Sequence, residues 1–76
     1  MSAKKSAAAR ALGEAIRSAR TERRYAQEAF AAHVGLDRSY FGAVERGDFN
    51  VTLGTVLKIA DGLGVRASTL LRRSQL

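Results

Sequence analysis

Apolar residues recur every three or four positions along most of this chain, which is the spacing of one face of an α-helix. The first stripe starts at about residue 8 and consists of Leu12, Ala15, Ile16 and Ala19. A second segment over 26–34 has an apolar side formed by Ala29, Phe30, Ala32 and Val34. A third segment over 38–46 turns Phe41 and Val44 inward and partly covers Glu45. The period of 3.6 residues therefore predicts helices in this part of the chain.

Glycines and capping residues mark where the helices begin and end. Gly35 suits the left-handed position that ends a helix, and Asp37 suits the cap of the next one. Gly47 ends the third helix, Thr52 can cap a fourth, and Gly64 ends that fourth helix. Only about three residues separate the second helix from the third, so the two are joined by a tight glycine turn.

Two further helices complete the prediction. The fourth turns inward Leu53, Val56, Leu57, Ala60 and Leu63. The fifth is short, runs from about 67 to 72, and offers Leu70 and Leu71. Residues 1–7 are small, polar and basic and are predicted to be a flexible tail, which leaves 8–76 as one domain. The pattern as a whole predicts an all-α fold, a compact bundle of five helices.

Composition limits the chemistry of this bundle. The chain has 76 residues, no cysteine and one histidine, so disulfides and thiolate sites are excluded. His33 alone cannot build a zinc site, and no metal or other cofactor is expected. No nucleophile–base pair or phosphate loop is present, and an enzyme is therefore not expected. No apolar run is long enough to span a membrane and no secretory signal is evident, which predicts a cytoplasmic protein.

The charge balance points to a polyanionic partner. Thirteen Lys and Arg stand against seven Asp and Glu, giving a net charge of +6 and a pI near 10.8. Such an excess favours nucleic acid or an acidic membrane surface, although a solvated basic surface has the same composition. The aromatic residues are divided among several segments, which disfavours a membrane-surface helix.

Two short helices joined by a glycine turn match the helix-turn-helix motif, whose second helix enters the DNA major groove. Arg38 at its start can pair with guanine O6 and N7, and Ser39 can bond several bases. Tyr40 is long enough to reach a phosphate or a thymine methyl group. Gly42 and Ala43, which we place on the outward side with Ser39, would let the helix approach the bases closely.

The sequence resembles a known family over residues 12–71. The stretches that carry the resemblance are "LGEAIRSAR", "QEAFAAHVGLDRSYFGAVERG" and "TLGTVLKIADGLGV". They resemble the Cro/C1-type helix-turn-helix (XRE) family of transcription regulators, and "LDRSYFGAVERGDFNVTL" looks most like the controller proteins of restriction–modification systems. The resemblance implies a lambda-repressor-like DNA-binding domain.

The resemblance also implies roles for particular residues. Gln27 matches the glutamine that clamps the DNA backbone. The base-contacting positions are Arg38, Ser39 and Ala43. The other phosphate-contacting positions are Tyr40, Arg46, Asn50 and Thr52. Arg20 and Glu45 match an internal ion pair that ties the first helix to the third.

The chain departs from the family pattern at three places. Arg24, Tyr25 and Ala26 replace the usual Gly, Leu and Ser before the glutamine, so Ala26 cannot cap the second helix with its side chain. Val51 replaces a proline, and Arg66 replaces a small polar cap before the last helix.

These observations predict a DNA-binding regulator that binds a palindromic operator as a homodimer. The dimer contact is expected from the fourth and fifth helices, with Ile59 or Leu76 as exposed apolar candidates. No small-molecule ligand is expected. The alternative is an antitoxin or another interaction module that uses this fold chiefly to hold a protein partner.

Overall fold

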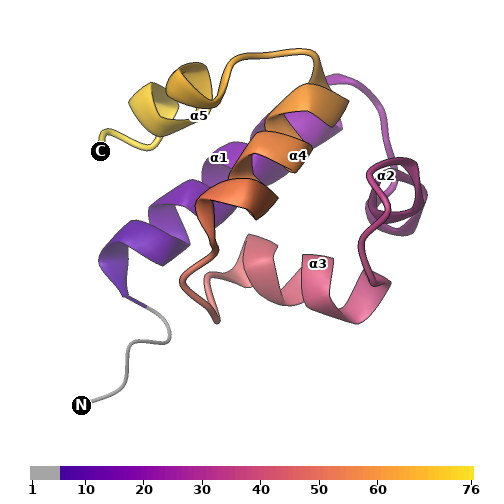
Figure 1. Cartoon of the computed structure of the whole chain (residues 1–76), viewed down its shortest axis with the longest axis horizontal. Coiled ribbons are helices and arrows are strands. Elements are labelled where there is room, and N and C mark those ends of the chain that lie inside the picture. Colours follow the sequence, from indigo (N-terminus) through magenta and orange to yellow (C-terminus); the bar gives the residue numbers. More distant parts are fainter. Residues whose placement is uncertain (1–5) are drawn as a thin grey trace.

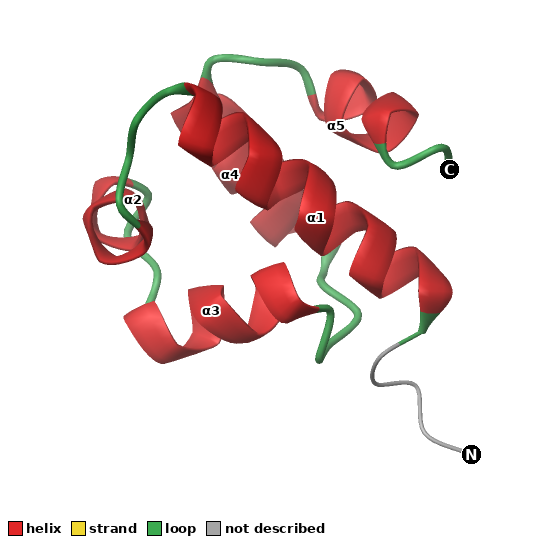
Figure 2. Cartoon of the chain, turned by 180° about the vertical axis from the view of Figure 1, so that it is seen from behind, coloured by secondary structure: helices red, strands yellow, loops and turns green. Residues whose placement is uncertain are grey.

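The computed structural model describes residues 6–76 of the chain, and these residues form helices joined by short connections, with no strand among them. The helices are α1 (Ala7–Glu22), α2 (Gln27–His33), α3 (Arg38–Arg46), α4 (Leu53–Leu63) and α5 (Ala67–Arg73). Figure 1 shows α1 and α4 side by side in the middle, with α5 above them and α3 below. The view from behind in Figure 2 places α2 and α3 next to one another at one end. The prediction of an all-α bundle of five helices is confirmed.

The first helix begins earlier than the sequence pattern indicated. Ser6 caps it, because the Ser6 Oγ accepts a hydrogen bond of 3.0 Å from the Ala9 amide, and Ala7 is its first residue. Residues 6 and 7 therefore belong to the helical domain rather than to the tail. The remaining predicted tail, including Lys4 and Lys5, lies outside the described residues.

The predicted turns and caps are confirmed. Gly35, Gly47 and Gly64 have φ of +73°, +79° and +76°, which is the left-handed conformation that glycine adopts most easily. Asp37 caps α3 by accepting from the Tyr40 amide at 3.0 Å. Thr52 caps α4 in the same way. The helices α2 and α5 have no side-chain cap, in agreement with alanine and arginine at their cap positions.

The core lies between all five helices. Its fully buried side chains are Phe30, Phe41, Ile16, Ile59, Leu70 and Val44. The rings of Phe30 and Phe41 lie 5.3 Å apart, so α2 and α3 are joined through an aromatic contact at the centre of the motif. Burying these side chains removes them from water at about 25 cal/mol per Å² of apolar surface, which is the main force that holds the short helices in place.

In two helices the buried face differs from the predicted one. In α4 the buried residues are Val56, Ile59, Ala60 and Leu63, which are spaced i, i+3, i+4 and i+7. Leu53 and Leu57 are 67% and 51% exposed, and the assignment of both to the core was wrong. Ile59 is fully buried, so it cannot be an exposed dimer contact, whereas Leu76 is 61% exposed.

In α2 the buried residues are Phe30 and Ala31, and Val34 follows at its end. Ala29 and Ala32, which the pattern placed inward, are exposed. Alanine fits either environment, so its position in a stripe is a weak guide to the side that faces the core.

One further backbone feature concerns the turn between α1 and α2. Arg24 has φ of +61°, a left-handed conformation that costs a residue with a Cβ about 1–2 kcal/mol relative to the right-handed one. This is the position where the resembled family usually has glycine. Within residues 6–76 no helix is long and apolar enough to span a membrane.

Candidate nucleic-acid interface

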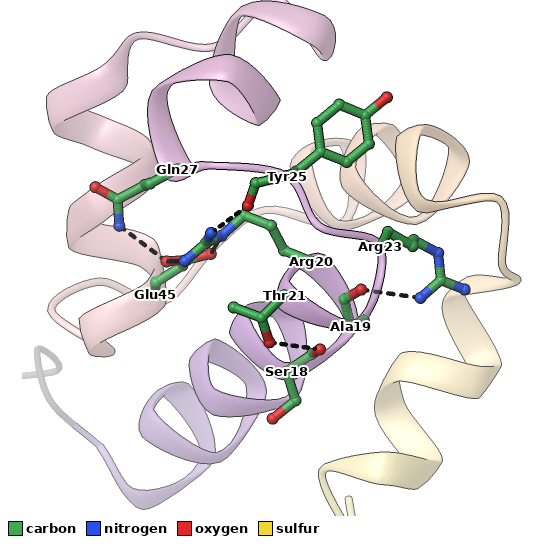
Figure 3. Close-up of polar contacts among 8 residues, drawn as sticks. All are labelled: Ser18, Ala19, Arg20, Thr21, Arg23, Tyr25, Gln27 and Glu45. Atoms are coloured by element: carbon green, nitrogen blue, oxygen red, sulfur yellow. Dashed lines mark hydrogen bonds and ion pairs between the residues drawn. The ribbon is translucent and has the colours of Figure 1, made fainter.

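Helix α3 is held in place by a buried polar cluster that involves three elements. The Arg20 Nε donates to Glu45 Oε2 at 2.7 Å, and Arg20 Nη2 donates to Glu45 Oε1 at 3.1 Å. Arg20 Nη1 also donates to the Tyr25 carbonyl at 2.7 Å (Figure 3). Both charged residues are buried, with exposures of 7% and 6%. Because a buried ion needs its partner, removing either charge would leave the other uncompensated and destabilise the fold.

Gln27, at the start of α2, joins this cluster. Its Nε2 donates to Glu45 Oε1 at 2.8 Å, and Figure 3 shows the amide lying beside the carboxylate. The hydrogen bond orients the Gln27 side chain across α3. The sequence pattern contained no signal for this contact, because residues 18 positions apart on different helices have no local relationship.

Gly42 makes room for that side chain. A Cβ built on Gly42 would lie 3.3 Å from Gln27 Oε1 and 3.4 Å from Arg46 Nη1, closer than ordinary van der Waals contact. Gly42 itself is buried. The absence of a side chain there therefore lets Gln27 and Arg46 lie close against α3.

A shallow recess on the outer side of α3 brings together several of the predicted DNA-contacting residues. It is lined by Gln27, Arg38, Ser39, Gly42 and Arg46. Arg38 and Ser39 are exposed in the first turn of the helix, and neither side chain is used in holding the fold. Their donors are therefore available to a partner that approaches this side of α3.

Ala43 does not lie on that side, and its expected outward position was wrong. It is only 7% exposed. After Gly47 the chain turns back against α3, and the Asp48 amide donates to the Ala43 carbonyl at 3.0 Å. This bond closes the C-terminal turn of α3. Because Ala43 is buried, its methyl group has little surface for a contact with a base.

The remaining predicted phosphate contacts are Tyr40 in the first turn of α3, Arg46 at its end, and Asn50 and Thr52 just before α4. Tyr40 is half-buried, and its ring lies 6.1 Å from that of Phe49, an exposed aromatic residue that the sequence analysis did not single out. Arg46 is exposed and pairs with Asp48 at 3.1 Å. The Asn50 Oδ1 accepts from Ser6 Oγ at 3.1 Å, and Thr52 is occupied as the α4 cap. Of these four residues, Arg46 lines the recess and the other three do not.

The described residues contain no group of three or more His, Cys, Asp or Glu side chains that could hold a metal ion. What the geometry offers instead is a positively charged face built from a short helix with exposed hydrogen-bond donors, supported by a second helix through buried contacts. This is the arrangement of a helix-turn-helix protein.

Comparison with known proteins identifies the type of helix-turn-helix. The profile of the helix-turn-helix family matches residues 16–70, and the chain belongs to this family, in its XRE-type branch of DNA-binding transcription regulators. The chain is 42% identical over 65 residues to the control protein C.SmaI of Serratia marcescens, covering 86% of this chain and 77% of that protein. It is 48% identical over 44 residues to the control protein C.MunI of a Mycoplasma species, and there the match spans 58% of this chain and 60% of the relative.

A solved structure gives the same result. The restriction–modification controller protein C.AhdI from Aeromonas hydrophila is 42% identical, with a TM-score of 0.82, over 86% of this chain and 98% of that one. The predicted family and its likeness to controller proteins are therefore confirmed. These relatives are regulators and not enzymes.

Proposed function

We propose that this protein is a sequence-specific transcription regulator that binds a palindromic DNA operator as a homodimer. In this proposal α3 enters the major groove, Arg38 and Ser39 contact base edges, and Gln27 and Arg46 contact the backbone on one side of the groove. The observation that carries the proposal is the recess on α3, where these four side chains from two helices meet. The net charge of +6 supports the same partner.

The remaining backbone contacts are assigned to Tyr40 in the first turn of α3 and to Asn50 and Thr52 just before α4. The likeness to controller proteins further supports a role at the promoter of a restriction–modification system, in the bacterial nucleoid. An endonuclease gene and a methyltransferase gene beside the gene for this protein would support that role.

The homodimer is proposed to form through α4 and α5. Leu53 and Leu57 on α4 and Leu76 after α5 are the exposed leucines of the described chain. Leu53 and Leu76, with the half-buried Val51 and Leu71, border one apolar groove, and Leu57 follows Leu53 by one turn of α4 outside that groove. Covering this surface with a second copy would remove it from water. The proposal requires that the dimer hold the two α3 helices about 34 Å apart, so that they enter successive major grooves.

Selection of bound duplexes from a random DNA pool tests the proposal. The expected result is a palindromic sequence bound by two copies of the chain. Arg38→Ala should then weaken binding to the selected site by about 1–3 kcal/mol and relax the preference at one base pair in each half-site. Gln27→Ala should weaken binding to specific and random DNA more evenly. If no sequence is enriched, or if Arg38→Ala keeps the full preference, the assigned role of α3 is wrong.

A further inference from the structure

A second recess lies beside the recognition surface, between α1 and α3. It is lined by Arg10, Glu14 and Arg17 of α1, by Gln27 at the start of α2 and by Arg46 at the end of α3, together with the Arg20–Glu45 pair. The residues from α1 are spaced by four and three positions, so they form one face of that helix. This face is not part of the helix-turn-helix itself.

The charged side chains around this recess differ in whether they are paired within the protein. Arg20 and Glu45 neutralise one another through their 2.7 Å contact, and Arg46 pairs with Asp48 at 3.1 Å. Arg17 is exposed, and its side chain makes no hydrogen bond or ion pair within the described part of the chain. Arg17 is therefore a cation that borders a concave surface and has no structural task in the protein alone.

The position of Arg17 is related to the proposed DNA contacts through shared residues. Gln27 and Arg46 line both recesses, so the surface is continuous from Arg38 on α3 to Arg17 on α1. A DNA strand whose phosphates lie at Gln27 and Arg46 would reach Arg17 by following this surface towards α1. Its next phosphates carry the negative charge that a guanidinium binds best.

We propose that Arg17 binds a phosphate of the DNA backbone adjacent to the one at Gln27 and Arg46, and that DNA contact thus extends from the helix-turn-helix onto α1. Glu14, one turn before Arg17 on the same face, opposes this contact by repelling the same strand. This inference rests on the proposed DNA-binding function. It adds a sequence-independent contact and a longer footprint on each half-site.

The salt dependence of binding tests the contact. The dissociation constant for the selected duplex is measured over a series of salt concentrations, because each neutralised phosphate contributes about 0.9 to the slope of log K against log salt. Arg17→Ala should lower the magnitude of the slope by about 0.9 per subunit. It should weaken binding to the selected duplex and to random DNA by the same factor. Arg17→Lys should keep most of the slope, and Glu14→Gln should strengthen binding.

Arg66→Ala is the matched control, since it removes the same charge from an exposed side chain that makes no cap hydrogen bond. Arg66 precedes the first residue of α5. Figures 1 and 2 show the connection from α4 to α5 on the opposite side of the molecule from α3. The salt-dependence slope of the Arg66→Ala variant should equal that of the parent protein. Circular dichroism of each variant checks that the helices and the melting temperature are kept.

Neutral methylphosphonate linkages locate the contact on the DNA. Each linkage is placed singly along the selected duplex. At one position the substitution should weaken binding by the parent protein and leave binding by the Arg17→Ala variant unchanged. An Arg17→Ala slope equal to that of the parent would overturn the inference, and so would saturable binding of inorganic phosphate that needs Arg17 while the DNA slope is unchanged. Failure of the parent protein itself to select any DNA would instead refute the proposed function.

Discussion

Gly13 lies where α1 crosses α3, and the crossing leaves no space for a side chain. A Cβ on Gly13 would lie 2.6 Å from the Val44 carbonyl oxygen and would also collide with the carbonyl of Glu45. Both neighbours are backbone atoms, which cannot move without shifting α3. The same approach brings Arg20 within hydrogen-bonding distance of Glu45, so one small residue on α1 permits the ion pair two turns later.

We therefore expect Gly13→Ala to destabilise the fold by about 1–3 kcal/mol, the usual cost of overpacking a tight contact. Gly54→Ala is the matched control, because Gly54 is also helical and its nearest neighbour would be Thr52 Oγ1 at 3.9 Å. That variant should gain about 0.4–1 kcal/mol from reduced freedom of the unfolded chain. Urea unfolding of the three proteins at one protein concentration measures both effects, and an unchanged Gly13→Ala midpoint would contradict the crossing geometry.

At the scale of elements, α2 shows how far packing replaces intrinsic helix stability. It has seven residues and an alanine at its cap position, whereas isolated helices shorter than about 12–15 residues are marginal in water. Phe30 fixes it to α3, and the hydrogen bond from Gln27 to Glu45 fixes its first turn. Helix α2 therefore depends on its tertiary contacts for stability.

The ends of α1 and α5 are joined by an ion pair that responds to pH. Arg73 Nη2 lies 2.8 Å from Glu22 Oε2, and this hydrogen bond, followed by the charge of Arg73, lowers the pKa of the Glu22 carboxyl. A lowered pKa in the folded state stabilises the fold above the ordinary glutamate pKa of about 4.3, and the contribution disappears as pH falls through the lowered value. The pair is exposed, so the contribution is small and screened by salt.

Glu22→Gln should accordingly lower the melting temperature slightly at pH 7, and this effect should disappear as pH falls below the lowered pKa of Glu22, where the carboxyl of the parent protein is also neutral. Melting curves of the parent and the variant, recorded from pH 7 downward at low salt, measure the difference. Adding Arg73→Gln to Glu22→Gln should cause little further change. A gap between parent and variant that stays constant over the whole pH range would show that the pair has another role.

At the scale of the whole molecule, three leucines remain in water on one side of a 76-residue chain. A domain this small buries a modest core, and association with a second copy adds apolar burial. One surface in the proposed dimer would thus have two effects. It would stabilise each copy, and it would fix the spacing of the two α3 helices for DNA binding.

Leu57→Glu should raise the dimer dissociation constant by about tenfold or more, since each copy would bury an unpaired charge. Sedimentation at micromolar concentration measures the change. Ala32→Glu adds the same charge to an exposed position on α2 and should leave the dimer intact. DNA binding by Leu57→Glu should weaken together with dimerisation. A Leu57→Glu protein that sediments as the parent does would place the interface elsewhere.

The sequence by itself determined the local features of this protein. Apolar periodicity predicts the five helices, and Gly35, Asp37 and Thr52 mark their ends, because each of these signals acts within a few residues of the chain. The exposed start of α3, with Arg38 and Ser39, follows from the same local pattern. Family resemblance supplied the Arg20–Glu45 pair, which the structure contains.

Only the tertiary structure decided which edge of each helix faces the core. A helical stripe has two edges of similar hydrophobicity, and the neighbours of α4 cover Ile59 and leave Leu57 in water. Ala43 is likewise buried, although the pattern of α3 placed it on the outward side. The continuous surface from Arg38 to Arg17 also joins residues that are far apart in sequence, and their proximity depends on how α1 packs against α3.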